Sequence, residues 1–168
     1  MNANVPGDPK PHQRIGAISN AHAGRDFEDA VQRYFMEQGL RLQRDFAVEI
    51  GHAFKKRHRF DLGSTDAAVL VECKSYAWTV TGKSPSAKIR SLNEAMLHFM
   101  LAPAGYRKLL VMLKSERLSG GESLASYYAR TQGHLIPPDV EVWQFDPATD
   151  SGEQLARLPL EYELCSTP

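Results

Sequence analysis

The feature that most constrains the fold is a short, almost continuously apolar segment in the middle of the chain. Residues 67–74 read Ala-Ala-Val-Leu-Val-Glu-Cys-Lys and follow a polar turn over residues 63–66. A strand with water on one face alternates apolar and polar residues, whereas a strand covered on both faces is nearly all apolar. The segment therefore predicts an inner strand of a sheet, with other elements packed against each of its faces.

The hydrophobic pattern on either side of this strand predicts its neighbours. Apolar residues at helical spacing predict helices over residues 24–39, 85–101 and 122–131, and Ser84 is a candidate cap for the second. Further strands are predicted over residues 42–50, 60–62, 108–113 and 140–145, with an edge strand within 154–164. Helix, three strands, helix, strand, helix, strand is an α/β order, and it predicts a mixed central sheet flanked by helices on both faces.

Length and composition indicate one ordinary globular domain. At 168 residues, with 42% hydrophobic and 24% charged residues, the chain can bury a real core. The proline-rich residues 1–20 are expected to form a flexible arm, and residues 21–168 a single domain. The chain has no apolar run of about 18 residues and no signal-peptide pattern, so we expect no membrane span. Its two cysteines, Cys73 and Cys165, do not resemble a disulfide framework, which favours a reducing, cytoplasmic setting.

Charged residues interrupt the apolar strands at three positions. Glu72 and Lys74 are two residues apart on one predicted strand, so their side chains point to the same face. Asp61 ends the preceding strand. Burying two carboxylates and an ammonium is costly unless they pair with each other or bind a cation. An exposed pair on an edge strand is the competing interpretation for Glu72 and Lys74, but the apolar run before them favours an inner strand.

This arrangement resembles the PD-(D/E)XK nuclease superfamily, whose pattern is an Asp at the end of one core strand and acid-x-Lys in the next. The matching residues are Asp61 and Glu72-Cys73-Lys74, and Phe60 stands where the family name has Pro. Gly24-Arg25-Asp26-Phe27-Glu28 is similar to the acid that many members carry in the first helix. The resemblance covers about residues 20–115 and implies a restriction endonuclease-like αβββαβ core. No family feature is visible beyond residue 115.

The resemblance implies a metal-dependent nuclease, and the residue types fit that chemistry. Asp61 and Glu72 offer the hard oxygen ligands that Mg2+ or Mn2+ prefers, and the backbone carbonyl of Cys73 can add another. Lys74 is expected to orient the attacking water and to offset charge in the transition state. Glu28 is expected to hold a second metal directly or through water. A simple helix-dipole role is the alternative for Glu28, because acids are favoured in a first helical turn.

A nuclease also needs a surface for its substrate, yet the net charge is zero, with 20 basic and 20 acidic residues. A local basic patch can still bind phosphates while the rest of the protein is acidic. The candidate nucleic-acid-binding residues are Lys55, Lys56, Arg57, Arg59, Lys83 and Lys88. A solvated hairpin tip is the alternative for the first four of them. Trp78 is a candidate for base stacking, although a loop tryptophan that covers the core is the more common case. The histidines show no spacing typical of a zinc site.

The expected function is therefore a Mg2+-dependent endonuclease that hydrolyses DNA phosphodiester bonds. Duplex or branched DNA would be its partner, in a restriction, repair or junction-resolving role. Cutting both strands of a duplex needs two sites, which is compatible with a homodimer. The alternative is a catalytically silent nucleic-acid-binding module of the same fold, from which loss of metal ligands would be expected. A small metabolic α/β enzyme has no support, because the chain has no glycine-rich phosphate loop or nucleophile elbow.

Overall fold

The computed structural model describes residues 15–79, 81–83, 85–117 and 120–155, with side chains described from residue 22 onward. Its helices are α1 (Ile15–Glu37), α2 (Ser86–Leu101) and α3 (Leu124–Gln132), and α3 runs into a 3-10 turn, η1 (Gly133–Leu135). Its strands are β1 (Gln43–Ile50), β2 (Lys56–Ser64), β3 (Val69–Lys74), β4 (Arg107–Leu113), β5 (Val140–Asp146) and β6 (Ser151–Gln154).

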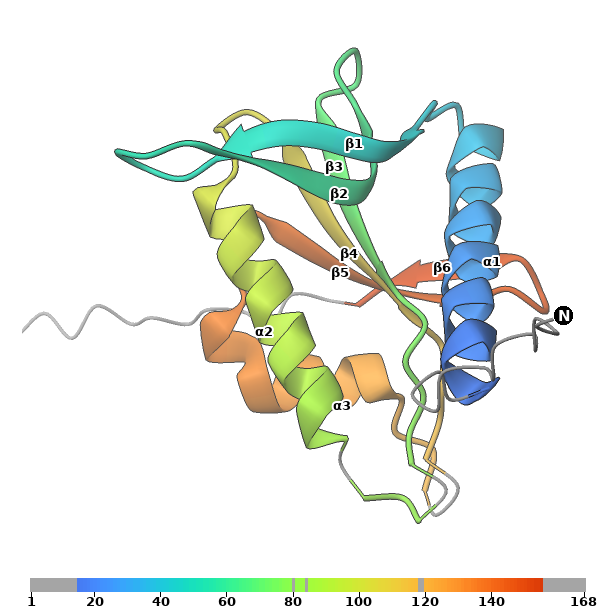
Figure 1. Ribbon diagram of the computed structural model, residues 1–168. Coiled ribbons are helices and arrows are strands. Elements are labelled where there is room, and N and C mark those ends of the chain that lie inside the picture. Colours follow the sequence, from blue (N-terminus) through green and yellow to red (C-terminus); the bar gives the residue numbers. More distant parts are fainter. Residues whose placement is uncertain (1–14, 80, 84, 118–119, 156–168) are drawn as a thin grey trace, which may run out of the picture.

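The strands form one mixed sheet in the order β1-β2-β3-β4-β5-β6 (Figure 1). The β1–β2, β2–β3 and β5–β6 pairs are antiparallel, whereas β3–β4 and β4–β5 are parallel. Parallel neighbours need a crossover connection, which α2 and α3 provide. The predicted α/β class, with a mixed central sheet, is confirmed.

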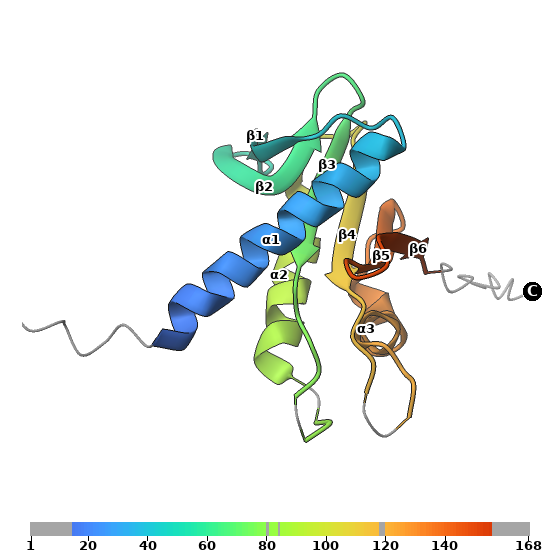
Figure 2. The same cartoon turned by 90° about the vertical axis from the view of Figure 1, so that its right-hand side faces the viewer.

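Helices cover both faces of the sheet and create two separate cores (Figures 1 and 2). On one face, Phe27 and Val31 of α1 pack with a cluster that includes Val71 of β3. On the other face, Leu92 of α2 and Tyr128 of α3 belong to a second cluster. The strand predicted to be covered on both faces is therefore covered on both. No helix within the described ranges is both long and apolar enough to cross a bilayer.

Some boundaries differ from the predicted ones. Helix α1 begins at Ile15 instead of near Gly24, so residues 15–20 of the predicted arm are helical, and residues 1–14 lie outside the described residues. Helix propagation fits residues 15–23, which contain three alanines and no proline. The predicted cap Ser84 lies outside the described residues, and Pro85 occupies the N-cap of α2.

The last strand also differs from its prediction. An edge strand was predicted within residues 154–164, but β6 ends at Gln154, and residues 156–168 lie outside the described residues. The sequence Ser-Gly-Glu-Gln has no apolar alternation, so β6 owes its conformation to pairing with β5.

Strand β2 contributes side chains first to one core and then, further along, to the other. Phe60 lies in the core beneath α2, whereas Leu62, two residues later, lies in the core beneath α1. Two residues of a regular strand would face the same side, so the backbone must turn at Asp61. Pairing of β2 with β3 covers three pairs and begins at Leu62↔Val71. Asp61 therefore stands where β2 separates from β3.

Gly63 next to this turn is expected to tolerate no side chain. A Cβ at Gly63 would lie 2.4 Å from Cδ1 of Phe46 on the neighbouring strand. We expect Gly63→Ala to lower the free energy of unfolding by about 1–3 kcal/mol, as overpacking does in other cores. Gly24→Ala is the matched control, because a Cβ there meets nothing within 4 Å and α1 should gain up to about 1 kcal/mol. Urea denaturation of both variants checks this, and equal stabilities would contradict it.

Candidate functional site

Asp61 replaces a missing strand partner at the point where β2 leaves β3. Its Oδ2 accepts a hydrogen bond of 2.7 Å from the backbone N–H of Cys73. This bond satisfies an amide that β2 no longer pairs, so the site residue is also structural. The amide and carbonyl of a strand residue point to the same edge, so the Cys73 carbonyl also faces β2. The two backbone groups and the Asp61 carboxylate thus meet at one place.

Glu72 and Lys74 of β3 form a three-residue ionic cluster with Asp61 of β2. The Lys74 ammonium lies 2.8 Å from Oε2 of Glu72 and 3.9 Å from Oδ2 of Asp61. Glu72 is 5% exposed, so its charge depends on protein partners more than on water. The structure thus brings together the Asp, Glu and Lys that the sequence pattern singled out. We call Asp61, Glu72 and Lys74 the acid–lysine cluster.

Burial and mutual repulsion shape the protonation of this cluster. Burial, followed by the charge of Glu72, raises the pKa of Asp61 to about 6. The two carboxyl groups are close enough to share a hydrogen bond, which raises the pKa of Asp61 further. Burial tends to lower the pKa of Lys74, but Glu72 and Asp61 outweigh it, so this pKa lies well above the usual lysine value. The ammonium therefore stays charged and balances carboxylates that repel each other.

Glu28 lies near this cluster but has a strong partner of its own. Its Oε2 is 2.5 Å from Nη2 of Arg44, and the same guanidinium also binds Asp29. Burial raises the pKa of Glu28, and the charge of Asp61 raises it further, so the two carboxylates are electrostatic neighbours. Strand β1 brings Arg44 opposite Leu62, on the face that α1 covers. No pattern in the sequence indicated this pairing, because an exposed-looking arginine in a strand carries no signal of its own.

The predicted basic patch lies on the hairpin formed by β1 and β2. Lys55 lies in the loop that joins β1 to β2, Lys56 pairs with Ile50 next to that loop, and Arg57 and Arg59 follow within β2. All four are exposed. Strand alternation places Arg57 and Arg59 on the face opposite to His58, while Lys56 shares the face of His58.

Three other predicted contact residues lie around the loop that follows β3. Lys83 is exposed, as a phosphate-binding residue would be. The Lys88 ammonium donates to the carbonyl of Ala77 at 3.1 Å, so it is anchored to the loop. Trp78 is buried, and its indole N–H donates to the carbonyl of Glu122. Trp78 thus covers the core, as loop tryptophans commonly do, and does not offer a stacking face.

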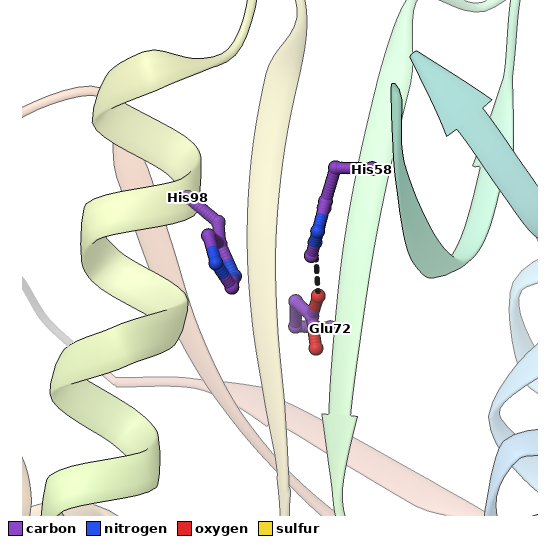
Figure 3. Close-up of side chains that lie close together, drawn as sticks. All are labelled: His58, Glu72 and His98. Atoms are coloured by element: carbon purple, nitrogen blue, oxygen red, sulfur yellow. Dashed lines mark ion pairs between the residues drawn. The ribbon is translucent and has the colours of Figure 1, made fainter. Parts of the chain in front are cut away.

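Two histidines that the sequence did not connect lie next to the acid–lysine cluster (Figure 3). Nε2 of His58 on β2 is 3.5 Å from Oε1 of Glu72, and the rings of His58 and His98 have centroids 4.0 Å apart. Burial lowers the pKa of both imidazoles, and His58 also lowers that of His98. One sign in the sequence that His98 faces the protein interior was its position next to Phe99, at the border of the buried stripe of α2. Spacing rules miss the pair, because they apply to ligands that are close in sequence.

Comparison of the chain with family models, with curated proteins and with solved structures found no match. Two acidic side chains, a backbone carbonyl and a charged amine meet at the end of β3. Such a set can bind a hard divalent cation and an oxyanion side by side.

Proposed function

We propose that the chain is a Mg2+-dependent endonuclease that hydrolyses DNA phosphodiester bonds with a PD-(D/E)XK-type site. One observation carries the proposal. The carboxyl groups of Asp61 and Glu72 meet where β2 separates from β3, and both are within ion-pair distance of the Lys74 ammonium. A pair of carboxylates pressed together is costly without a cation, so the site is suited to binding one.

The order of elements supports the same proposal. The succession α1, β1, β2, β3, α2, β4 has the αβββαβ order of a restriction endonuclease-like core. Within it, an antiparallel set β1–β2–β3 leads through α2 to β4, which is parallel to β3. The acidic residues lie on β2 and β3, and the additional acid Glu28 lies on α1. This order of elements supports the proposal.

The donor atoms fit a magnesium ion. Asp61 and Glu72 present carboxylate oxygens, and the Cys73 carbonyl faces the same edge of β3, which gives an all-oxygen set. Bound Mg2+ would supply Lewis acidity toward a phosphate and would lower the pKa of a water molecule. Replacing repulsion between two carboxylates by attraction to a shared cation would also stabilise this end of the sheet.

The residues of the chain have separable tasks in this proposal. Lys74 holds a positive charge beside both carboxylates, where it can orient a water molecule and offset charge on a phosphate oxygen. Glu28 has one oxygen bound to Arg44, so it can contribute its other oxygen to a metal or to a bound water. Arg57, Arg59 and Lys83 are exposed and are proposed to contact DNA phosphates.

Cleavage assays with a panel of DNA substrates test the proposal. Linear duplex, four-way junction, flap and single-stranded DNA are incubated with the full chain in Mg2+, in Mn2+ and in EDTA. We expect cleavage of at least one substrate in Mg2+ or Mn2+ and none in EDTA. Intact DNA in every metal, combined with binding to the same DNA in a mobility-shift assay, would contradict the proposal and favour a silent binding module.

A further inference from the structure

Three side chains from three different elements meet beside the acid–lysine cluster. They are His58 of β2, Glu72 of β3 and His98 of α2, and one potential ligand atom from each lies within 4.8 Å of the other two. Figure 3 shows the His58 ring next to the Glu72 carboxylate and the His98 ring of α2 beside them. We call these residues the histidine cluster.

The hydrogen bonding of the histidine cluster is incomplete. Nε2 of His58 is buried and has no hydrogen-bond partner among the described residues, although Oε1 of Glu72 is 3.5 Å away. That distance is too long for a good hydrogen bond. Buried polar atoms nearly always have a partner, and an exception calls for a ligand, a water molecule or an ion. A purely structural His–Glu pair would be expected to bond directly.

The Glu72 carboxylate has two sides, and each faces a different set of groups. Oε2 lies 2.8 Å from the Lys74 ammonium, on the side of the acid–lysine cluster, whereas Oε1 faces His58. One carboxylate oxygen is therefore available to the histidine cluster while the other stays paired. The donor set on that side is two imidazole nitrogens and one carboxylate oxygen.

We propose that His58, Glu72 and His98 form a binding site for a transition-metal dication, with Zn2+ as the best fit. Imidazole nitrogen is a preferred ligand of Zn2+ and its neighbours in the first transition row, whereas Mg2+ prefers oxygen. Two histidines and a glutamate are a known ligand combination for zinc with an open coordination position. The site shares Glu72 with the all-oxygen set proposed for Mg2+, but two imidazole nitrogens take the place of Asp61 and the Cys73 carbonyl. Binding of Zn2+ there can be measured without any nuclease activity.

Calorimetric titration without DNA tests the site. The full chain, stripped of metal with a chelator, is titrated with ZnCl2 and separately with MgCl2. We expect one Zn2+ per chain, and at least about tenfold weaker binding by His98→Gln and by His58→Gln, since even loss of a supporting group around a metal costs that much. His134→Gln is the matched control, because His134 is exposed on η1. It is expected to bind Zn2+ as the unaltered chain does.

A spectroscopic readout distinguishes ligation from an indirect effect. Co2+ bound by nitrogen and oxygen ligands absorbs visible light, and we expect this absorption in the unaltered chain and its loss in His98→Gln. Circular dichroism of each variant checks that it is folded, and the second variant, His58→Gln, serves if the first is not. Equal Zn2+ affinity of the unaltered chain and both folded variants would overturn the proposal, as would Mg2+ binding that both histidine variants weaken as strongly as Zn2+ binding. Equal Zn2+ affinities would not bear on DNA cleavage.

Discussion

Replacing Lys74 with Met is expected to abolish DNA cleavage and to lower the free energy of unfolding by about 3–5 kcal/mol at pH 8. The variant leaves the buried Glu72 carboxylate and the half-buried Asp61 carboxylate without the ammonium that lies 2.8 Å from Glu72 and 3.9 Å from Asp61. Removing one partner of a buried ion pair costs more than the pair contributes, because the remaining charge has no compensation. Cleavage is lost because no other cation of the cluster can orient the water.

The pH dependence of the Lys74→Met variant follows from the same charges. Lys74 has a raised pKa in the folded protein, so its stabilising effect is complete below the usual lysine value of 10.5 and is lost only above it. Between pH 5 and 8 the unaltered chain therefore keeps this contribution. In the variant the Asp61 carboxyl, whose pKa is raised, takes up a proton as the pH falls, so the stability deficit of the variant should shrink toward pH 5. Urea denaturation at both pH values measures this.

A matched control separates the site from the general cost of burying a lysine. Lys108 of β4 is also buried and pairs with Asp139 at 2.6 Å, at the other end of the sheet. Lys108→Met is expected to alter stability but to leave cleavage per folded molecule unchanged. If Lys74→Met cleaved DNA as fast as Lys108→Met, Lys74 would have no part in catalysis.

Replacing Asp61 with Asn is expected to raise the stability of the protein and to lower its activity. Its pKa is raised from 3.8 to about 6, which means that the folded protein disfavours the ionised carboxylate. Stability of the unaltered chain should therefore fall as the pH rises from 3.8 to about 6, and the full penalty should persist above that. Asn removes the charge and keeps an oxygen for the Cys73 amide, so we expect about 2 kcal/mol of added stability at pH 8. The gain should vanish at pH 3.5.

Cleavage by the Asp61→Asn variant is expected to fall at least about a thousandfold, because a neutral amide is a poor ligand for Mg2+ and gives little electrostatic stabilisation. Thermal denaturation at pH 8 and initial cleavage rates in Mg2+ measure the two effects. Asp139→Asn is the control, since Asp139 pairs with Lys108 away from the site. An Asp61→Asn variant that was less stable and fully active would mean that Asp61 serves the fold alone.

Higher stability together with lost activity is typical of residues that are kept for function. We expect this combination for Asp61, because Asp61 and Glu72 repel each other next to an apolar core. A residue kept only for the fold would be expected to cost stability when it is changed. The stability measurement on Asp61→Asn therefore tests the site even before a DNA substrate has been identified.

Local patterns in the sequence determined much of the fold. The apolar run ending at Lys74 specified an inner strand, and the stripe Leu92, Ala95, Met96 and Phe99 specified a helix with one buried face. Such patterns repeat every two or 3.6 residues, so they can be recognised without knowing what packs against them. The same periodicity placed Glu72 and Lys74 on one face of β3. Their spacing from Asp61 on the preceding strand then indicated one site.

Only the tertiary structure decided how the cluster is completed. The turn of β2 at Asp61, the pairing of Arg44 with Glu28, and the approach of His98 to His58 all depend on how separate elements pack. These contacts join residues that are far apart in sequence, through the crossover from β3 to α2 and the pairing of β1 with β2. A periodic pattern predicts which face of a helix or strand a side chain occupies. The pattern does not predict which other side chain will contact that residue, because the contact depends on the register and angle at which the elements pack.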